Sequence, residues 1–170
     1  MTRRTAMNRL DRMIARLTAQ RACLAHCAAL IADLPGPVLE IGYGKGRTYS
    51  FLTEVLPTRE IFAFDRDGAP STEWGPDADH FFAGDFGDTF ARVLARTGAP
   101  AALAHADIGS ENAARDARLA AWMSGALPPL IAAGGIIVSD RELKVAGGET
   151  LPLPADTGSW PYFIVRRPAP

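Results

Sequence analysis

The chain has 170 residues, of which 48% are hydrophobic and 22% charged, a composition typical of a folded globular protein and unlike that of a disordered one. Its formal net charge of -1 and pI of about 6.3 exclude an overall basic nucleic-acid-binding surface. No apolar run reaches the roughly 18 residues that a membrane span needs, so we expect no membrane partner.

Residues 6–33 predict an N-terminal helical segment, formed by one helix or by two in series. Apolar residues recur there at spacings of three, four or seven: Met7, Leu10, Ile14, Leu17, Leu24, Ala28 and Ile31. The helix is predicted to end at Pro35-Gly36-Pro37. Charges interrupt the apolar residues near the N-terminus, so no signal peptide is expected. The only cysteines, Cys23 and Cys27, share one helix face and are interpreted as small buried side chains, which favours a cytoplasmic location.

Beyond this segment, short apolar runs alternate with helical patterns. The runs predict strands at 38–41, 60–65, 80–85, 101–107 and 134–140. Helices are predicted at about 47–56, 86–98 and 111–126, whereas 66–78 contains prolines and glycines and reads as a loop. Two closing strands follow at 149–154 and 162–168, in a hairpin across 155–160.

Buried strands that alternate with helices are typical of an α/β fold, doubly wound, with a mostly parallel sheet between two helical layers. No repeat or linker is visible, so we expect a single domain over residues 1–170. In it, a helical cap at 1–36 precedes a Rossmann-like core at 37–170.

Acidic residues gather where the predicted strands end. They are Glu40, Asp65, Asp85, Asp107 and Asp140. In sheets of this kind, ligands bind beyond the carboxyl ends of the strands, where the connections diverge. The acids therefore predict a ligand site at that edge.

The stretch "LEIGYGKG" (39–46) places a glycine loop between the first strand and a helix. Gly42, Gly44 and Gly46 follow the pattern G-x-G-x-G, one residue shorter than the dinucleotide fingerprint, whose third glycine position holds Arg47 here. Such a loop lets backbone N–H groups approach a ligand. Glu40, two residues before the first glycine, would repel a pyrophosphate and attract an ammonium or sulfonium group.

From about Val38 to the C-terminus the sequence resembles the class I S-adenosylmethionine-dependent methyltransferases, most specifically in "VLEIGYGKG". The resemblance implies methyltransferase activity, S-adenosylmethionine as cofactor, and a seven-stranded sheet with an antiparallel C-terminal strand. It also implies a set of cofactor-binding residues. These are Glu40 near the methionine amino group, Gly42, Tyr43, Gly44 and Gly46 in the loop, Asp65 and Arg66 at the ribose, Gly84, Asp85 and Phe86 near the adenine, and Asp107.

Some of these acids have an alternative interpretation. Asp85 and Asp107 precede predicted helices and could serve as N-caps instead of ligand contacts. Asp67 competes with Asp65 for the ribose, but Asp67 lies beyond the strand end, so Asp65 is preferred.

The methyl acceptor is harder to read. The strand-four stretch "AHADIGS" lacks the motifs of amino-methylating and cytosine-methylating DNA enzymes, which favours a small-molecule substrate and no nucleic acid. Asp107 and Asp140 resemble the metal ligands of small O-methyltransferases, but Arg141 replaces their asparagine and would repel a cation. We therefore predict no metal, with Asp107, Asp140 and Arg141 facing the acceptor on the catalytic side. Trp160 is either an acceptor-pocket wall or a core residue.

Two other functions stay open at this point. A nicotinamide-dependent oxidoreductase would use the same fold, although the glycine spacing and Glu40 argue against it. The other alternative is a module that binds S-adenosylmethionine without catalysis. Arg141 at the position of a metal ligand and the short stretch after strand two both favour it. The apolar stripe of the N-terminal helix leaves a homodimer open.

Overall fold

The computed structural model of the chain describes residues 7–67, 69–70 and 73–169. Its helices are α1 (Arg9–Leu30), α2 (Arg47–Val55), α3 (Phe86–Phe90), α4 (Val93–Thr97) and α5 (Ala113–Ala126), with short 3-10 helices η1 (Pro128–Leu130) and η2 (Ala155–Thr157). Its strands are β1 (Val38–Ile41), β2 (Ile61–Asp65), β3 (Phe81–Ala83), β4 (Ala101–Ala106), β5 (Ile131–Ser139), β6 (Glu149–Leu151) and β7 (Phe163–Arg166).

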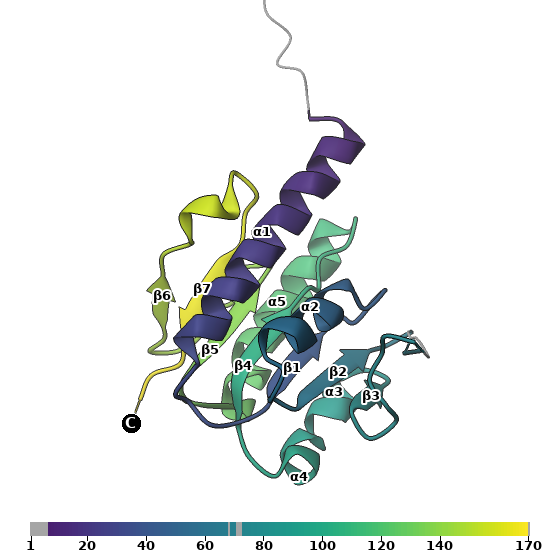
Figure 1. Ribbon diagram of the computed structural model, residues 1–170, viewed down its shortest axis with the longest axis vertical. Coiled ribbons are helices and arrows are strands. Elements are labelled where there is room, and N and C mark those ends of the chain that lie inside the picture. Colours follow the sequence, from purple (N-terminus) through teal and green to yellow (C-terminus); the bar gives the residue numbers. More distant parts are fainter. Residues whose placement is uncertain (1–6, 68, 71–72, 170) are drawn as a thin grey trace, which may run out of the picture.

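The strands form one seven-stranded sheet in the order β3-β2-β1-β4-β5-β7-β6 (Figure 1). β1 to β5 pair in parallel, whereas β7 pairs antiparallel with β5 and with β6. The predicted doubly wound, mostly parallel sheet with an antiparallel C-terminal strand is confirmed.

The order of the strands fixes where a ligand can bind. β2 and β3 follow β1 toward one edge of the sheet, and β4 and β5 lie on the other side of β1. The connections therefore diverge between β1 and β4, the place where open α/β sheets bind their ligands. The two strands end together there, because the N–H of Asp107 donates to the carbonyl of Ile41 at 2.9 Å.

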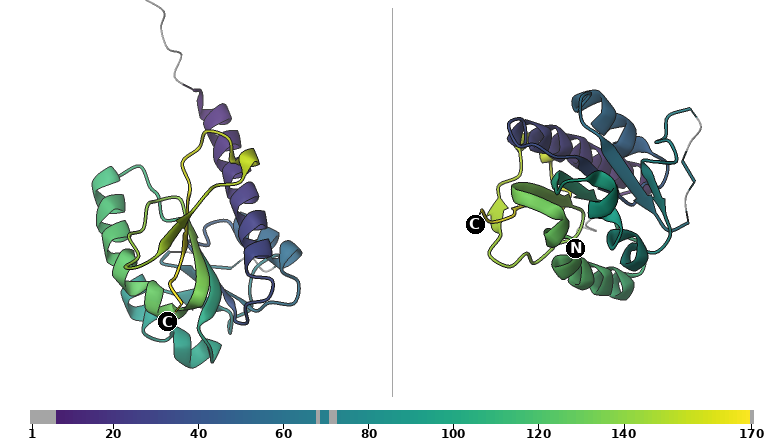
Figure 2. Two further views of the ribbon diagram at one scale, coloured as in Figure 1. Left: turned by 90° about the vertical axis from the view of Figure 1, so that its left-hand side faces the viewer. Right: turned by 90° about the horizontal axis from the view of Figure 1, so that it is seen from below.

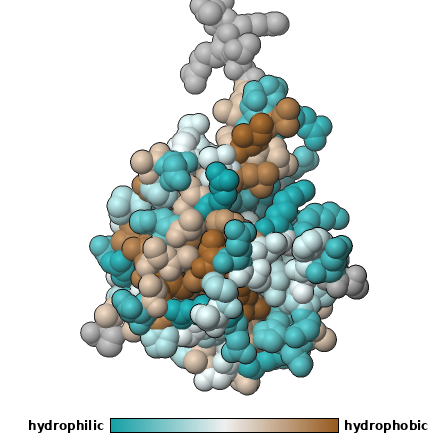
Figure 3. Space-filling view, viewed as in Figure 1, coloured by the Kyte–Doolittle hydropathy of each residue, from teal (hydrophilic) through white to brown (hydrophobic). Residues whose placement is uncertain are grey.

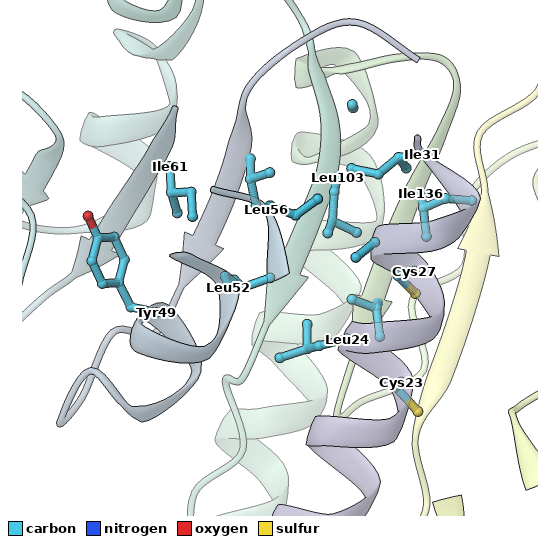
Figure 4. Close-up of a cluster of buried hydrophobic side chains, with 14 of the residues drawn as sticks. Cys23, Leu24, Cys27, Ile31, Tyr49, Leu52, Leu56, Ile61, Leu103 and Ile136 are labelled. Carbon is cyan, nitrogen blue, oxygen red and sulfur yellow. The ribbon is translucent and has the colours of Figure 1, made fainter. Parts of the chain in front are cut away.

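Helices cover both faces of the sheet, with α1 on one side and α5 on the other (Figure 2). Buried residues of α1 and α2 pack on one face, including Leu24, Cys27 and Leu52 against Leu103 and Ile136 (Figure 4). On the opposite face, α3, α4 and α5 contribute the apolar residues Phe90, Val93, Ala120 and Met123. Because both faces of the sheet are buried, the central strands are largely apolar and do not alternate between apolar and polar residues.

A single helix, α1, forms the N-terminal segment, which resolves the choice between one helix and two. The side chain of Asn8 caps its start by accepting from the N–H of Asp11 at 2.9 Å. Just beyond its end, the Arg59 guanidinium donates to the carbonyls of Ile31 and Leu34 and so holds the turn that follows the helix.

The N-terminal half of α1 extends beyond the sheet (Figure 1). Four apolar side chains are exposed along it, Leu10, Met13, Ile14 and Leu17. Figure 3 shows brown, hydrophobic atoms on this projecting part of the molecule.

Several element boundaries differ from the prediction. The helix expected at 86–98 is split into α3 and α4, and the third strand spans only Phe81–Ala83. β5 begins three residues earlier than expected, and its pairing with β4 shifts register after Ala101. The closing strands do pair antiparallel, but η2 lies between them, so the connection is longer than a tight hairpin.

Candidate functional site

A cavity of about 610 Å³ opens at the carboxyl ends of the central strands, a size that suits a nucleotide-like ligand. Its lining residues come from the glycine loop, from the ends of β2, β3 and β4, and from one face of α5. They are Gly42, Asp65, Arg66, Asp67, Asp85, Phe86, Gly87, Asp107, Ile108, Gly109, Ser110, Arg115, Arg118, Leu119 and Trp122. We call this space the cofactor cavity.

The glycine loop runs close to the end of β4. Gly42 has a φ of 91°, and a Cβ added to it would lie 2.2 Å from the carbonyl oxygen of Asp107. Only glycine fits this position without moving the backbone. Tyr43 is buried and packs edge to face on Tyr49 and Phe81, so its ring belongs to the core. Gly46 stands at the N-cap of α2.

Asp65, at the end of β2, lines the cofactor cavity and also orders the glycine loop. Its carboxylate accepts from the N–H of Gly44 at 2.7 Å and from the N–H of Asp67 at 3.0 Å. Arg66 hydrogen-bonds to Asp67, which raises the pKa of the guanidinium.

Asp85 combines the two roles that the sequence left open. It caps α3, accepting from the N–H of Gly87 at 2.9 Å, and it lines the cofactor cavity together with Phe86. Gly84, directly before it, adopts a φ of 121° where β3 turns into the cap.

Glu40 is fully buried and belongs to a hydrogen-bond network of side chains. It is paired across the sheet with His105 of β4, whose Nδ1 lies 2.7 Å from the Glu40 carboxylate. The Thr48 hydroxyl donates to the other carboxylate oxygen of Glu40. His105 Nε2 lies 2.5 Å from the Tyr162 hydroxyl. Glu40 is not among the described residues that line the cofactor cavity, and its role at the methionine amino group stays a prediction.

Burial lowers the pKa of His105, but the adjacent Glu40 carboxylate and its hydrogen bond outweigh burial, so the pKa is raised. Burial also raises the pKa of Tyr162 well above its ordinary value. Because both ring nitrogens of His105 have partners inside the fold, this imidazole is a packed residue and does not face the cofactor cavity.

Asp107, which lines the cofactor cavity, is held from the N-terminal helix. Arg16 Nη2 lies 2.7 Å from one carboxylate oxygen, and Gln20 Nε2 donates to the other at 2.8 Å. The predicted helical cap therefore reaches the site through these two side chains. Sequence reasoning missed both, although Arg9, Arg12, Arg16 and Gln20 recur at the three- and four-residue spacing of one helix face.

Asp140 fixes the loop that follows β4. Its buried carboxylate accepts from the N–H groups of Ile108 and Gly109, each at 3.0 Å. Burial raises its pKa, and so does the nearby charge of Asp107. Asp140 therefore holds residues 107–110 in place.

Arg141 joins this loop to α5. Its guanidinium donates to Asp140 at 3.1 Å and to Asp116 at 2.9 Å. Burial raises the pKa of Asp116, but hydrogen bonds from Ser110 and from Arg141 outweigh burial, so the pKa is lowered. The sequence did not single out Asp116 or the face of α5 that lines the cavity, because the apolar pattern of that helix is weak.

No group of three or more histidine, cysteine or acidic side chains suited to a metal ion occurs among residues 7–67, 69–70 and 73–169. Over the same part of the chain, none of the helices combines the length and the apolar character needed to cross a membrane.

Comparison with known proteins decides the family. The profile of one family, described as S-adenosyl-L-methionine methyltransferase, matches residues 7–167. The chain belongs to this methyltransferase family. The resemblance noted in the sequence is thereby confirmed, and S-adenosylmethionine is the cofactor of the enzyme.

Solved methyltransferases share the fold. A crystal structure of an S-adenosyl-L-methionine methyltransferase from Silicibacter pomeroyi is 40% identical, with a TM-score of 0.87 over 95% of this chain and 99% of that one. The TDP-rhamnose 3'-O-methyltransferase CalS11, from calicheamicin biosynthesis, is 18% identical, with a TM-score of 0.57 over 94% of this chain and 80% of that one. Human N-acetylserotonin methyltransferase, solved with S-adenosylmethionine, is 13% identical, with a TM-score of 0.57 over 92% and 53%. No match was found among curated proteins.

The residues of the cofactor cavity fit S-adenosylmethionine. Asp65 and Asp85 both line the cavity, and carboxylate oxygens are acceptors of the kind that hydroxyl and amino groups need. Phe86 and Trp122 supply flat apolar surface of the kind that an adenine ring needs.

Proposed function

We propose that this methyltransferase acts on a small-molecule acceptor, with its cofactor bound in the cofactor cavity. When bound, S-adenosylmethionine would supply a methyl group on a positively charged sulfur, which would leave as a neutral thioether when the acceptor's lone pair takes the methyl group. The chain's own task is positioning, which is sufficient for a large acceleration when the reacting atoms are held in line.

The single observation that carries this proposal is the shared location of Asp65, Asp85 and Gly42. They come from three separate segments and line one cavity at the divergence of the strands. Asp65 would accept from the ribose hydroxyls, with Arg66 beside it, and Asp85 with Gly84 and Phe86 would bind the adenine. The loop from Gly42 to Gly46, including Tyr43 and Gly44, would bring its backbone to the methionine part.

On the acceptor side, we infer that Asp107, Asp140 and Arg141 act by holding the 107–110 loop. All three already have partners within the fold, and only Asp107 also lines the cofactor cavity. His105 is fully buried and lines neither the cofactor cavity nor the smaller cavity beside it, so it is not placed to accept a proton from the acceptor.

The remaining proposals follow from the sequence. We take residues 1–170 as one domain, which is supported by the contacts of Arg16 and Gln20 with Asp107. The buried free thiols Cys23 and Cys27 are consistent with the cytoplasm as the expected location. A homodimer through the exposed apolar side chains of α1 is an expectation that sedimentation would test.

The cofactor proposal is tested by Asp65→Ala. Removing the carboxylate should raise the Kd for S-adenosylhomocysteine about tenfold to a hundredfold, because charged hydrogen bonds contribute roughly 1.5–3 kcal/mol. Isothermal calorimetry measures the change. Asp88→Ala is the matched control, since Asp88 is exposed on neighbouring α3 and lies outside the lining residues.

Asp65 also orders the glycine loop, so a folding defect must be separated from a binding defect. Asp65→Asn keeps the shape and one acceptor oxygen, and thermal melting of each variant checks folding. Binding by a folded Asp65→Ala protein that matches the wild type would refute the assignment.

A further inference from the structure

A second cavity, of about 360 Å³, adjoins the cofactor cavity. The two share Gly109 and Ser110 as lining residues. The other walls of the second cavity come from the projecting half of α1, from the residue after Ser110, from the segment after β5 and from Trp160. They are Arg9, Arg12, Met13, Arg16, Glu111, Asp140 and Arg141. Its size is within the range of small-molecule sites.

Positive charge dominates this second cavity. Four arginines and two acidic residues line it, which leaves a formal excess of two positive charges. One of the acids, Asp140, already accepts from two backbone N–H groups and from Arg141. The cofactor cavity has the opposite balance, with four aspartates and three arginines. Two neighbouring cavities with opposite net charge would each favour a ligand of the opposite sign, a cation in the cofactor cavity and an anion in the second cavity.

Two of the four arginines are available to a ligand. Arg16 is paired with Asp107, and Arg141 with Asp116 and Asp140. Arg9 and Arg12 form no ion pair and no side-chain hydrogen bond with any residue of the described part of the chain. Guanidinium groups bind carboxylate and phosphate oxygens through two parallel hydrogen bonds.

An apolar surface lies beside these charges. Trp160 is half-buried against the core that α1 and the sheet form, and Met13 faces the same space. A tryptophan ring held at one edge by the core offers a flat wall to an aromatic or otherwise planar group. The cavity therefore combines an anion-binding end with an apolar wall.

We propose that the second cavity binds the methyl acceptor, and that the acceptor carries a carboxylate or phosphate group held by Arg9 and Arg12, with a planar apolar part against Trp160. The inference rests on the proposed function and names its substrate class. The anion is the anchoring group and a different atom is methylated, because an oxygen whose lone pairs accept guanidinium N–H bonds is a poorer nucleophile. The methylated atom lies toward Gly109 and Ser110, where the two cavities meet.

Binding of simple probes tests the charge requirement. Benzoate and phenyl phosphate, compared with neutral benzamide, are titrated into the ¹⁵N-labelled protein saturated with S-adenosylhomocysteine, at low salt to limit screening. The Trp160 indole N–H signal, assigned with Trp160→Phe, reports binding. We expect at least one of the two anions to shift this signal until it saturates. Benzamide should bind at least about tenfold more weakly than that anion. The stronger anion identifies the carboxylate or the phosphate as the anchor.

Arg9→Gln/Arg12→Gln should weaken the anionic probe about tenfold or more while leaving S-adenosylhomocysteine affinity within about twofold of the wild type. Arg21→Gln is the matched control, because Arg21 is exposed on the same helix and lines neither cavity. Benzamide binding as tightly as benzoate and phenyl phosphate, or an unchanged affinity in the double variant, would overturn the inference.

Failure of the proposed function is recognised separately. If calorimetry shows that the wild type does not bind S-adenosylhomocysteine, the methyltransferase site is misplaced. The probe titration, repeated without S-adenosylhomocysteine, then still tests the anion site. With binding established, labelled methyl transfer into a metabolite extract separated on an anion exchanger should give a retained, still charged product. A label found only in neutral products would overturn the anchoring role of the anion.

Discussion

Glu40 and His105 are neighbours across β1 and β4, and their side chains form a charge-assisted hydrogen bond with no exposure to solvent. Such a pair is costly to bury and is tolerated only when the remaining polar atoms also have partners. Thr48 and Tyr162 supply them. A glutamate within an apolar strand indicates that a partner residue exists. Which residue that is depends on which strand lies beside β1, and residue types alone do not reveal the order of the strands.

The raised pKa of His105 predicts a pH dependence of stability. Folding raises this pKa above 6.5 because Glu40, Asp107 and Asp140 surround the imidazole, despite the opposing effect of burial. A group whose pKa is raised by folding stabilises the folded state fully at pH values below its pKa in the unfolded state. This stabilisation is lost as the pH rises through its pKa in the folded state. The free energy of unfolding of the wild type minus that of His105→Gln should therefore be smaller at a pH well above 6.5 than at a pH below it.

Urea denaturation at both pH values measures this difference. Tyr162, whose pKa is raised well above 10, does not ionise at either pH. His26→Gln is the control for loss of an imidazole, because His26 forms no ion pair with a described residue. A difference that grows with pH would mean that folding lowers the pKa of His105.

At the scale of elements, α1 is more than a cover for the sheet. Its buried half packs on the sheet through Leu24 and Cys27, and its projecting half brings Arg16 to Asp107. The apolar spacing predicted the helix well, because tertiary burial imposes that spacing. The polar face was not interpreted, since the target of an arginine on a helix cannot be known before the helix is placed on the sheet.

Arg16→Ala should disturb the cofactor side of the site from a distance. The change leaves the largely buried Asp107 carboxylate without its cationic partner, a loss that typically destabilises a protein by about 1–3 kcal/mol. Because Asp107 lines the cofactor cavity, S-adenosylhomocysteine affinity should fall several-fold as well. Urea denaturation and calorimetry measure the two effects, and Arg21→Ala serves as the control. Equal behaviour of both variants would show that α1 only covers the sheet.

For the whole molecule, the alternation of strands and helices was enough to predict the architecture, since buried parallel strands joined by helices have few stable arrangements. The acids at the strand ends likewise predicted the edge of the sheet at which the cofactor cavity opens. Details that arise from packing were not predictable. The register shift beside Ala101 and the early start of β5 depend on how β4 and β5 pair, and sequence periodicity carries no information on pairing.

Stability of the whole fold should depend strongly on the central strand. Leu103 of β4 is fully buried in the cluster shared by α1, α2 and the sheet. Leu103→Ala should lower the free energy of unfolding by about 2–5 kcal/mol, through lost burial and a residual cavity. Leu94→Ala, at an exposed apolar position on α4, should change it by less than about 0.5 kcal/mol. Denaturant unfolding distinguishes the two, and comparable losses would contradict the burial described here.

The partition between the two cavities also limits how the enzyme can change its substrates. A side chain at Gly109 would collide with the carboxylate of Asp140 and the guanidinium of Arg141, because its Cβ would lie 2.2 Å and 2.4 Å from them. A side chain there would require Asp140 and Arg141 to move, and Asp140 holds the loop through the N–H groups of Ile108 and Gly109. New acceptor preferences should therefore evolve by exchanging residues of the projecting half of α1 and around Trp160. Residues there can change while the binding of the methyl donor is kept.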